Sequence, residues 1–440
     1  MKKNLFYIVS AIVCVSCTFG PHFDVDFTQL PDHPDWFRVS SSRTTDLSDG
    51  IPSDCYFMDG MRAREAAELP EFSLVEQPQS EPGGPLRTSS TTAVNIVQNL
   101  FNFSQGKRVV ELSGTYMSVD LDGNPIRLSG KVVMPADGKA KCAILVSHYT
   151  IGSNAEAPSN AFPLEGVLAS LGYVLIFPDY LGYGITRDYT HPYLVLEQTA
   201  RNEADMIFAV MPFLQAAGVE LEYPDGLMLM GYSQGGANTM ALLYYLETNY
   251  PDRFYIHRVF AGGGPYDVLA TYQKFVSTNV ADYPVAVPLV LQGMIKGNRL
   301  DLEISDLVQP WLYTNFDKWI NSLEYTTGQV NTLIGTKVTS EMLTPLGMDL
   351  KSDKVSELYK AMTVNSILSY SWTPKAPIYM FHSVDDETVS FINATRARGK
   401  WTNANIQYNF GNYGTHQMGC LRFIFSLRTL LEEEYKSKNW

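Results

Sequence analysis

The sequence has few cysteines, which limits the stabilising and metal-binding devices open to the fold. It contains 5 cysteines in 440 residues, and two of them lie within the first 17 residues. The other three, Cys55, Cys142 and Cys420, are too widely spaced for a disulfide framework, although one bonded pair stays open. The 7 histidines occur in no HExxH motif. We therefore expect Cys142 and Cys420 to be buried free thiols, and we expect neither a metal site nor an organic cofactor.

Basic residues are scarce relative to acidic ones. The chain has 33 lysines and arginines against 46 aspartates and glutamates, which gives a formal net charge of -13. Phosphates of nucleic acids and anionic membrane lipids repel such a chain, so neither is expected as its main partner. The hydrophobic fraction of 45% is that of a globular protein with a sizeable core. No feature fixes the oligomeric state.

The chain lacks a hydrophobic run long enough to cross a bilayer as a helix. The apolar run "LFYIVSAIVCV" at residues 5–15 is too short for this and follows two lysines, as in an export signal. It ends in Ser16 and Cys17, a small residue before a cysteine. We interpret residues 1–17 as a lipoprotein-type signal peptide whose cleavage leaves a lipidated Cys17 as a membrane tether. The protein is then exported, as a cell-envelope lipoprotein (periplasmic or outer-membrane surface) or in secreted form.

Composition divides the remaining chain into an extension and a regular domain. Residues 18–106 are rich in proline, serine and aspartate and are predicted to be an extension and linker, with a short helix at residues 93–103. Residues 107–440 alternate apolar strand patterns with helical ones, which predicts an α/β fold with a mostly parallel sheet flanked by helices. The alternation stops over about residues 266–372, where mixed helical patterns predict a cap inserted before a late strand.

The stretch "LMLMGYSQGGANTM", residues 227–240, contains the sequence G-x-S-x-G between an apolar strand pattern and a helical one. A nucleophile at a strand-to-helix bend has strained backbone angles, so its neighbours must be small, and Gly231 and Gly235 meet this need. The alternative interpretation is an ordinary tight turn. Ser233 is therefore the candidate nucleophile, and the helix that follows it offers N–H groups to a developing oxyanion.

A serine nucleophile needs a histidine base and a carboxylate that orients the base, in the chain order serine, acid, histidine. "YMFHSVDDETVS" places Asp385 and Asp386 after a predicted strand, and either could be the acid. "YNFGNYGTHQMG" places His416 after the next strand, at the start of the last helix.

The oxyanion donors are expected on two loops. One donor is the backbone N–H of Gln234, directly after the nucleophile, and the other is the backbone N–H of Tyr149 or Thr150, after the strand pattern "CAILVSHY". The neighbouring His148 is expected to be buried and hydrogen-bonded rather than catalytic.

Four motifs together resemble the α/β-hydrolase superfamily, and within it the secretory-lipase (lipase A-like) esterases. They are "SHYTIGSNAEAPS", "FPDYLGYG", "GYSQGG" and "WTPKAPIYMFHSVDDETVSFINA", within a resemblance over roughly residues 109–431. The resemblance implies an α/β-hydrolase fold with a helical cap before the acid-bearing strand. Aligning the last motif on His382 and Val389 puts the acid at Asp386. The same matching implies Ser233 as nucleophile, His416 as base, and Tyr149 with Gln234 as oxyanion donors.

Three positions depart from the family pattern. Ser383 and Ser390 replace a glycine and a proline of the acid loop, and Tyr149 replaces the glycine of the oxyanion loop. These departures concern the shape of the acyl pocket and leave the triad intact.

The sequence thus predicts a serine esterase or lipase of the cell envelope that acts on a small-molecule, glycan or lipid ester through an acyl-enzyme. One alternative is a serine peptidase of the prolyl or aminopeptidase type, which would use the same triad. A second is a lipid-tethered binding protein that keeps the fold without turnover.

Overall fold

The computed structural model describes residues 25–30, 33–50, 52–58, 61–62, 75–76, 90–91, 107–349, 351–403 and 405–437. The predicted signal peptide and the helix expected at residues 93–103 lie outside these residues. Within them every helix is too short or too polar to cross a bilayer.

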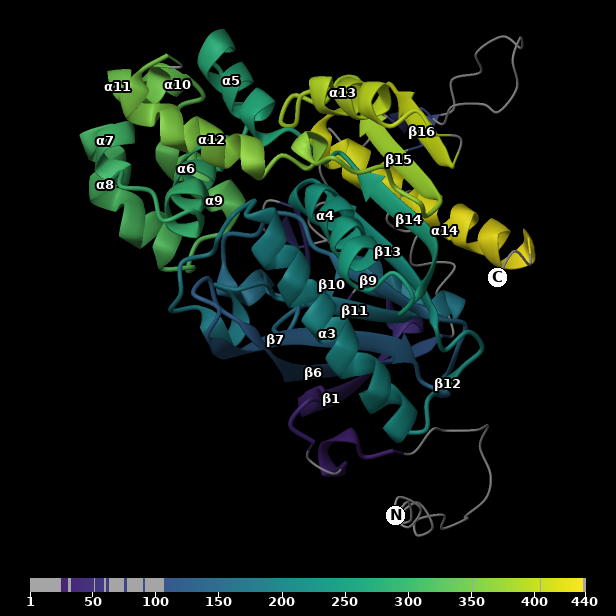
Figure 1. The fold of residues 1–440 in the computed structure, drawn as a ribbon. Helices are drawn as coiled ribbons and strands as arrows, with labels where there is room; N and C mark the ends of the chain where they lie inside the picture. The colour runs from purple at the N-terminus through teal and green to yellow at the C-terminus, as the bar shows by residue number, and fades with distance from the viewer. Residues whose placement is uncertain are drawn as a thin grey trace, which may run out of the picture.

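A nine-stranded sheet forms the centre of the described chain (Figure 1). The strand order is β1-β6-β7-β11-β9-β13-β14-β15-β16. The pairs from β1 to β11 are antiparallel and those from β11 to β16 are parallel, which confirms the predicted mostly parallel α/β sheet. In sheet order the strands are β1 (Arg38–Asp46), β6 (Arg108–Val119), β7 (Pro125–Pro135), β11 (Val174–Pro178), β9 (Ala143–Ser147), β13 (Gly226–Tyr232), β14 (Tyr255–Gly262), β15 (Ile378–Ser383) and β16 (Ile406–Gly411).

Helices cover both faces of this sheet. Every residue of β9, β11, β13 and β15 is buried, as expected for parallel strands that are covered on both sides. Helices α3 (Leu196–Ala216) and α4 (Gln234–Asn249) pack on one face. Helix α14 (His416–Ser437) and the 3-10 helix η6 (Leu164–Leu171) pack on the other. Cys55, Cys142 and Cys420 are buried free thiols.

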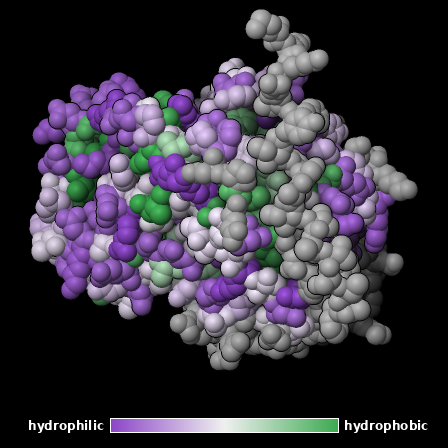
Figure 2. Space-filling model, turned by 90° about the horizontal axis from the view of Figure 1, so that it is seen from below, coloured by the Kyte–Doolittle hydropathy of each residue, from purple (hydrophilic) through white to green (hydrophobic). Residues whose placement is uncertain are grey.

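The chain between β14 and β15 folds mainly into short helices, which lie together beyond the end of the sheet, in green in Figure 1. This is the segment interpreted above as a cap. Large apolar side chains are exposed on it at Trp311, Tyr313 and Leu333. On the face shown in Figure 2, hydrophobic side chains form small patches set among hydrophilic ones. The cap helices are α5 (Val268–Thr278), α6 (Ala286–Gly297), α7 (Ile304–Leu307), α8 (Pro310–Phe316), α9 (Thr327–Ile334), α10 (Thr339–Met342), α11 (Pro345–Met348) and α12 (Ser356–Val364).

The sheet begins earlier in the chain than the sequence predicts. Residues 18–106 were expected to be extension and linker, but β1 lies within them and pairs with β6 from Arg38–Thr115 to Asp46–Arg108. The strand was missed because it lies at the sheet edge, where its side chains are mostly exposed and polar and show no apolar alternation. Arg43 of this strand donates two hydrogen bonds to the buried carboxylate of Glu111, at 2.9 and 2.8 Å.

Candidate active site

Ser233 occupies a sharp turn between β13 and α4. Its φ of 58° and ψ of -126° put a non-glycine residue in a sparsely populated backbone region, at a cost of about 1–3 kcal/mol. The turn is held by the Ser233 N–H, which donates to the carbonyl of Gly262 at 2.9 Å. Gly231 and Gly235 are needed because a β-carbon at either position would collide with backbone atoms: the carbonyl of Gly235 in the first case and that of Ser147 in the second. This geometry matches the strained bend expected from the sequence and not an ordinary turn.

The structure brings Ser233, His416 and Asp386 into one hydrogen-bonded path. His416 Nε2 lies 2.8 Å from Ser233 Oγ, and His416 Nδ1 lies 2.7 Å from Asp386 Oδ2. The three residues are 6%, 2% and 5% exposed, respectively. They come from the turn after β13, the start of α14 and the loop after β15, all at the carboxyl edge of the parallel strands. A histidine between a hydroxyl and a carboxylate in this way can accept the hydroxyl proton and be stabilised as a cation.

Asp386, and not Asp385, faces the histidine. Asp386 Oδ1 accepts hydrogen bonds from the backbone N–H groups of Thr388 and Val389, at 3.0 and 2.7 Å, which leaves Oδ2 for His416. Asp385 is exposed.

His382 forms a hydrogen bond to the same loop. Its Nε2–H donates to the Val389 carbonyl at 2.9 Å and lies 3.5 Å from Asp386 Oδ2. Burial lowers the pKa of His382, so the ring stays neutral and holds the loop in place.

The two residues predicted to supply the oxyanion donors lie at the start of α4 and in the loop after β9. Gln234 is the first residue of α4, so the helix itself does not use its N–H. Tyr149 follows β9, and its side chain turns away: its hydroxyl donates to the Tyr56 carbonyl at 3.3 Å. Its neighbour Thr150 lines the cavity beside Ser233, with its hydroxyl 2.8 Å from that of Tyr193.

His148 is turned into the protein, as expected. Its Nδ1 lies 2.6 Å from the Tyr149 carbonyl and its Nε2 lies 3.2 Å from the Asp179 carbonyl. Burial lowers its pKa to about 4, so the ring is neutral and one nitrogen at a time can donate.

His191 is a site residue that sequence reasoning missed. Its Nδ1–H donates to the Leu181 carbonyl at 2.8 Å, so Nε2 is the acceptor and takes a 2.9 Å hydrogen bond from the side-chain amide of Gln234. Burial lowers its pKa to about 3, which keeps Nε2 unprotonated for this contact. No motif marks His191, because its role depends on a contact with a residue that is distant in the sequence.

A cavity of about 30 Å³ lies directly beside Ser233 and His416. Its other walls come from the loops after β9 and β11, from the cap, from the acid loop and from the N-terminal segment. They are Met58, Thr150, Tyr193, Leu194, Pro265, Thr271, Phe275, Tyr283, Ala286, Val290, Thr388 and Val389.

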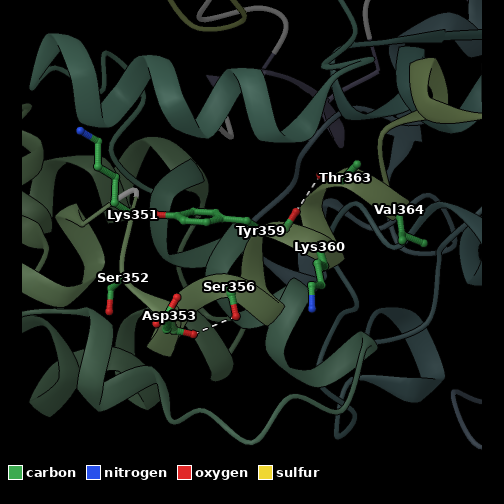
Figure 3. Close-up of a pocket in the computed structure, with 8 residues that line it drawn as sticks. All are labelled: Lys351, Ser352, Asp353, Ser356, Tyr359, Lys360, Thr363 and Val364. Atoms are coloured by element: carbon green, nitrogen blue, oxygen red, sulfur yellow. Dashed lines mark hydrogen bonds between the residues drawn. The ribbon is translucent and has the colours of Figure 1, made fainter.

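A wider hollow of about 440 Å³ lies elsewhere, along α12 of the cap and the turn before it (Figure 3). Its lining contains none of the three residues of the hydrogen-bonded path and includes two lysine and two serine side chains. Among the described residues no group of three or more histidine, cysteine, aspartate or glutamate side chains could hold a metal ion.

The chain is similar to proteins described as lipases and esterases. The family model described as "Secretory lipase" matches residues 160–417. A secreted triacylglycerol lipase, LIP5 of Malassezia furfur, is 26% identical over 256 residues, which cover 56% of this chain and 61% of that protein. The match thus spans about three-fifths of the length of this curated relative.

Two solved structures share the fold. The rice cell wall degrading esterase LipA from Xanthomonas oryzae has a TM-score of 0.67 at 21% identity, over 78% of this chain and 95% of that one. Candida antarctica lipase A has a TM-score of 0.54 at 14% identity, over 91% of this chain and 83% of that one. The fold is therefore that of the α/β-hydrolases, as the motifs predict.

Proposed function

The chain belongs to the secretory lipase family, and we propose that it is a serine hydrolase that cleaves carboxylic esters. The observation that carries this proposal is the buried path from Ser233 Oγ through both ring nitrogens of His416 to Asp386, with distances of 2.8 and 2.7 Å. The names of the relatives, a triacylglycerol lipase and a cell-wall-degrading esterase, support an ester as the substrate.

In the proposed reaction, His416 Nε2 takes the proton of Ser233 as Oγ attacks the ester carbonyl carbon. Asp386 accepts the Nδ1–H of His416, which selects the tautomer with a free Nε2 and stabilises the imidazolium that forms. The tetrahedral intermediate then collapses, the ester C–O bond breaks, and the imidazolium gives its proton to the leaving alcohol. In the second half of the reaction, His416 Nε2 takes a proton from a water molecule whose oxygen attacks the acyl carbonyl carbon. The bond between that carbon and Ser233 Oγ then breaks, the imidazolium returns its proton to Oγ, and the carboxylic acid leaves.

We assign the oxyanion site to the backbone N–H groups of Gln234 and Tyr149. Support for Gln234 comes from its place at the start of α4, where the positive end of the helix dipole adds to its N–H. The contact between its side chain and His191 holds this residue in one orientation. Support for Tyr149 is its position in the loop that ends β9, next to Thr150 in the cavity wall.

We propose in addition that the protein is exported and tethered through Cys17. The sequence of residues 1–17 supports both parts of this proposal, and the word "secreted" in the name of the curated relative supports export alone. Incorporation of labelled palmitate into the full chain expressed in a bacterium tests the tether. Cys17→Ala should abolish the label, and equal labelling of the variant would contradict the proposal.

A fluorophosphonate probe with a panel of chromogenic substrates tests the activity. We expect the probe to label the protein and Ser233→Ala to lose both the label and at least about 10³-fold of the hydrolysis of short-chain p-nitrophenyl esters. Aminoacyl-nitroanilides should be poor substrates, and a preference for them would indicate a peptidase instead. An unlabelled and inactive wild-type protein would indicate a binding protein.

A further inference from the structure

Met58, a residue of the N-terminal segment, lies at the candidate active site. It lines the same cavity as Ser233 and His416, and it is 3% exposed. The family model begins at residue 160, so this wall of the cavity lies outside the matched part of the chain.

The chain before Met58 is held firmly against the rest of the fold. Strand β2 (Cys55–Phe57) pairs in parallel with β10 (Phe162–Pro163), and the Phe162 N–H donates to the Asp54 carbonyl at 3.2 Å. Arg43 Nη1 lies 2.8 Å from Asp54 Oδ2, which connects this segment to β1. Met58 directly follows β2, so its backbone position is set by these contacts. It is part of a wall rather than of an unattached end of the chain.

The cavity is small for a substrate site. Its volume of about 30 Å³ compares with about 150 Å³ for an apolar cavity that admits benzene. Its remaining walls are largely apolar and include Leu194 and, from the cap, Phe275 and Val290. A space of this size beside the nucleophile accommodates a group of one or two carbon atoms but not an alkyl chain.

We propose that the ester cleaved by Ser233 carries a short acyl group of about acetyl size, and that Met58 sets this limit. This inference rests on the proposed ester hydrolysis. When Ser233 Oγ bonds to the carbonyl carbon and the alcohol leaves with the proton from His416, the acyl group stays bound to the serine until water displaces it. The cavity beside Ser233 therefore has to hold the acyl group through both steps, and its volume limits both.

Substitution of Met58 in the full-length protein tests the limit. The substrates are p-nitrophenyl acetate, butyrate and octanoate, which share one leaving group and differ only in acyl length. We expect the wild type to prefer acetate. Met58→Ala removes most of the side chain from the wall and should raise the butyrate-to-acetate ratio of kcat/KM at least 10-fold, since each methylene in an apolar pocket changes this quantity about 10–200-fold. Met58→Val, a milder change, should give an intermediate ratio.

Met134→Ala is the matched control. Met134 is fully buried in β7 and is absent from the lining of this cavity, so its loss should lower stability and leave the chain-length ratio unchanged. Titration with a fluorophosphonate probe gives the active fraction of each variant, so that poor folding is not mistaken for a change in preference.

Several outcomes would overturn the inference. An unchanged ratio in both Met58 variants, or a wild-type preference for octanoate, would show that Met58 does not limit the acyl group, while Ser233-dependent hydrolysis would still support the proposed function. A series of acetate esters with longer alcohols provides a further check: if Met58→Ala changes preference in that series instead, the cavity holds the alcohol. Loss of all Ser233-dependent hydrolysis in the wild type would contradict the proposed function itself.

Discussion

The backbone N–H of Val389 donates a 2.7 Å hydrogen bond to Oδ1 of Asp386 and so orients the carboxylate toward His416. A second N–H, from Thr388, reaches the same oxygen at 3.0 Å. With Oδ1 occupied, Oδ2 is the atom that meets the imidazole at 2.7 Å. The acid loop therefore fixes the carboxylate before any substrate binds, and the histidine has one orientation available.

The first prediction separates the two adjacent aspartates of this loop. Asp386→Asn replaces the acceptor for the Nδ1–H of His416 with an amide that can present a donor, so the histidine takes the wrong tautomer. We expect kcat for p-nitrophenyl acetate to fall about 10⁴-fold with little change in the melting temperature. Asp385→Asn is the control, since this side chain is exposed, and it should stay within about twofold of the wild type. Similar losses in both variants would contradict the assignment.

Much of the site could be predicted because it depends on order along the chain. In a parallel sheet the carboxyl ends of the strands meet at one edge, so Ser233, Asp386 and His416, each placed just after a strand pattern, were expected to converge. The apolar runs of β9, β13 and β15 are continuous because helices cover both faces, and this made the sheet visible in the sequence.

Other features could not be predicted, for physical reasons. Strand β1 is polar because it lies at an edge, and its sequence resembles a linker. Met58 and His191 contribute through contacts with residues far away in the sequence, and neither lies in a periodic pattern or a motif. Sequence patterns report local geometry and burial, whereas these two contacts depend on how distant segments pack.

The second prediction concerns the glycine that follows the nucleophile by two residues. In Gly235→Ala the new β-carbon would collide with the carbonyl oxygen of Ser147, a backbone atom at the carboxyl end of the central strand β9 that has little room to shift. We expect a loss of about 3 kcal/mol or more in the free energy of unfolding, and loss of activity through displacement of the Ser233 turn. Urea denaturation and fluorophosphonate labelling measure the two effects.

Gly399→Ala is the matched control for this substitution. Gly399 lies in helix α13 (Ile392–Lys400), and a β-carbon there would meet nothing within 4 Å. Alanine is preferred over glycine in helices by up to about 1 kcal/mol, so this variant should be slightly stabilised and fully active. A Gly235→Ala protein as stable and active as Gly399→Ala would disprove the steric argument.

The third prediction is a pH dependence of stability that arises from Glu203, a residue of α3 whose carboxyl group lies near the Ser147 hydroxyl. Both carboxylate oxygens are buried and have no hydrogen-bond partner of normal geometry among the described residues, although the hydroxyls of Ser147 and Tyr180 lie near enough to affect the carboxyl. Burial raises the pKa of Glu203 from 4.5 to about 8. The native protein therefore holds a proton that the unfolded chain has released, and the contribution of Glu203 to stability declines as the pH rises from about 4.5 to 8.

Glu203→Gln keeps this side chain neutral at every pH. Its unfolding free energy should equal that of the wild type near pH 4.5 and exceed it by about 2–5 kcal/mol above pH 8. Glu197→Gln, an exposed glutamate on the same helix, should track the wild type throughout. Chemical denaturation at a series of pH values measures the difference, and parallel curves for wild type and Glu203→Gln would show that Glu203 is ionised in the fold.

The last prediction concerns the buried ion cluster that attaches β1 to the rest of the sheet. Glu111 is 3% exposed, and its carboxylate accepts hydrogen bonds from Lys131 Nζ at 2.8 Å and from Arg43. Lys131 is almost as buried and also donates to the Ala161 carbonyl at 2.7 Å. Glu111→Ala would leave the ammonium of Lys131 buried without a counter-charge, which typically costs about 3–5 kcal/mol.

The double variant Glu111→Leu with Lys131→Met separates charge from packing, because it removes both buried charges and keeps most of the volume. It should recover at least half of the stability lost in Glu111→Ala, since a buried ion pair contributes little net stability compared with apolar side chains of similar size. The exposed pair of Lys360 and Glu357, at 2.6 Å, is the matched control, and Glu357→Ala should change the unfolding free energy by no more than about 1 kcal/mol. If the double variant is no more stable than Glu111→Ala, the cluster contributes through the specific geometry of its hydrogen bonds to β1 and Ala161, and the desolvated charge of Lys131 is not the dominant cost.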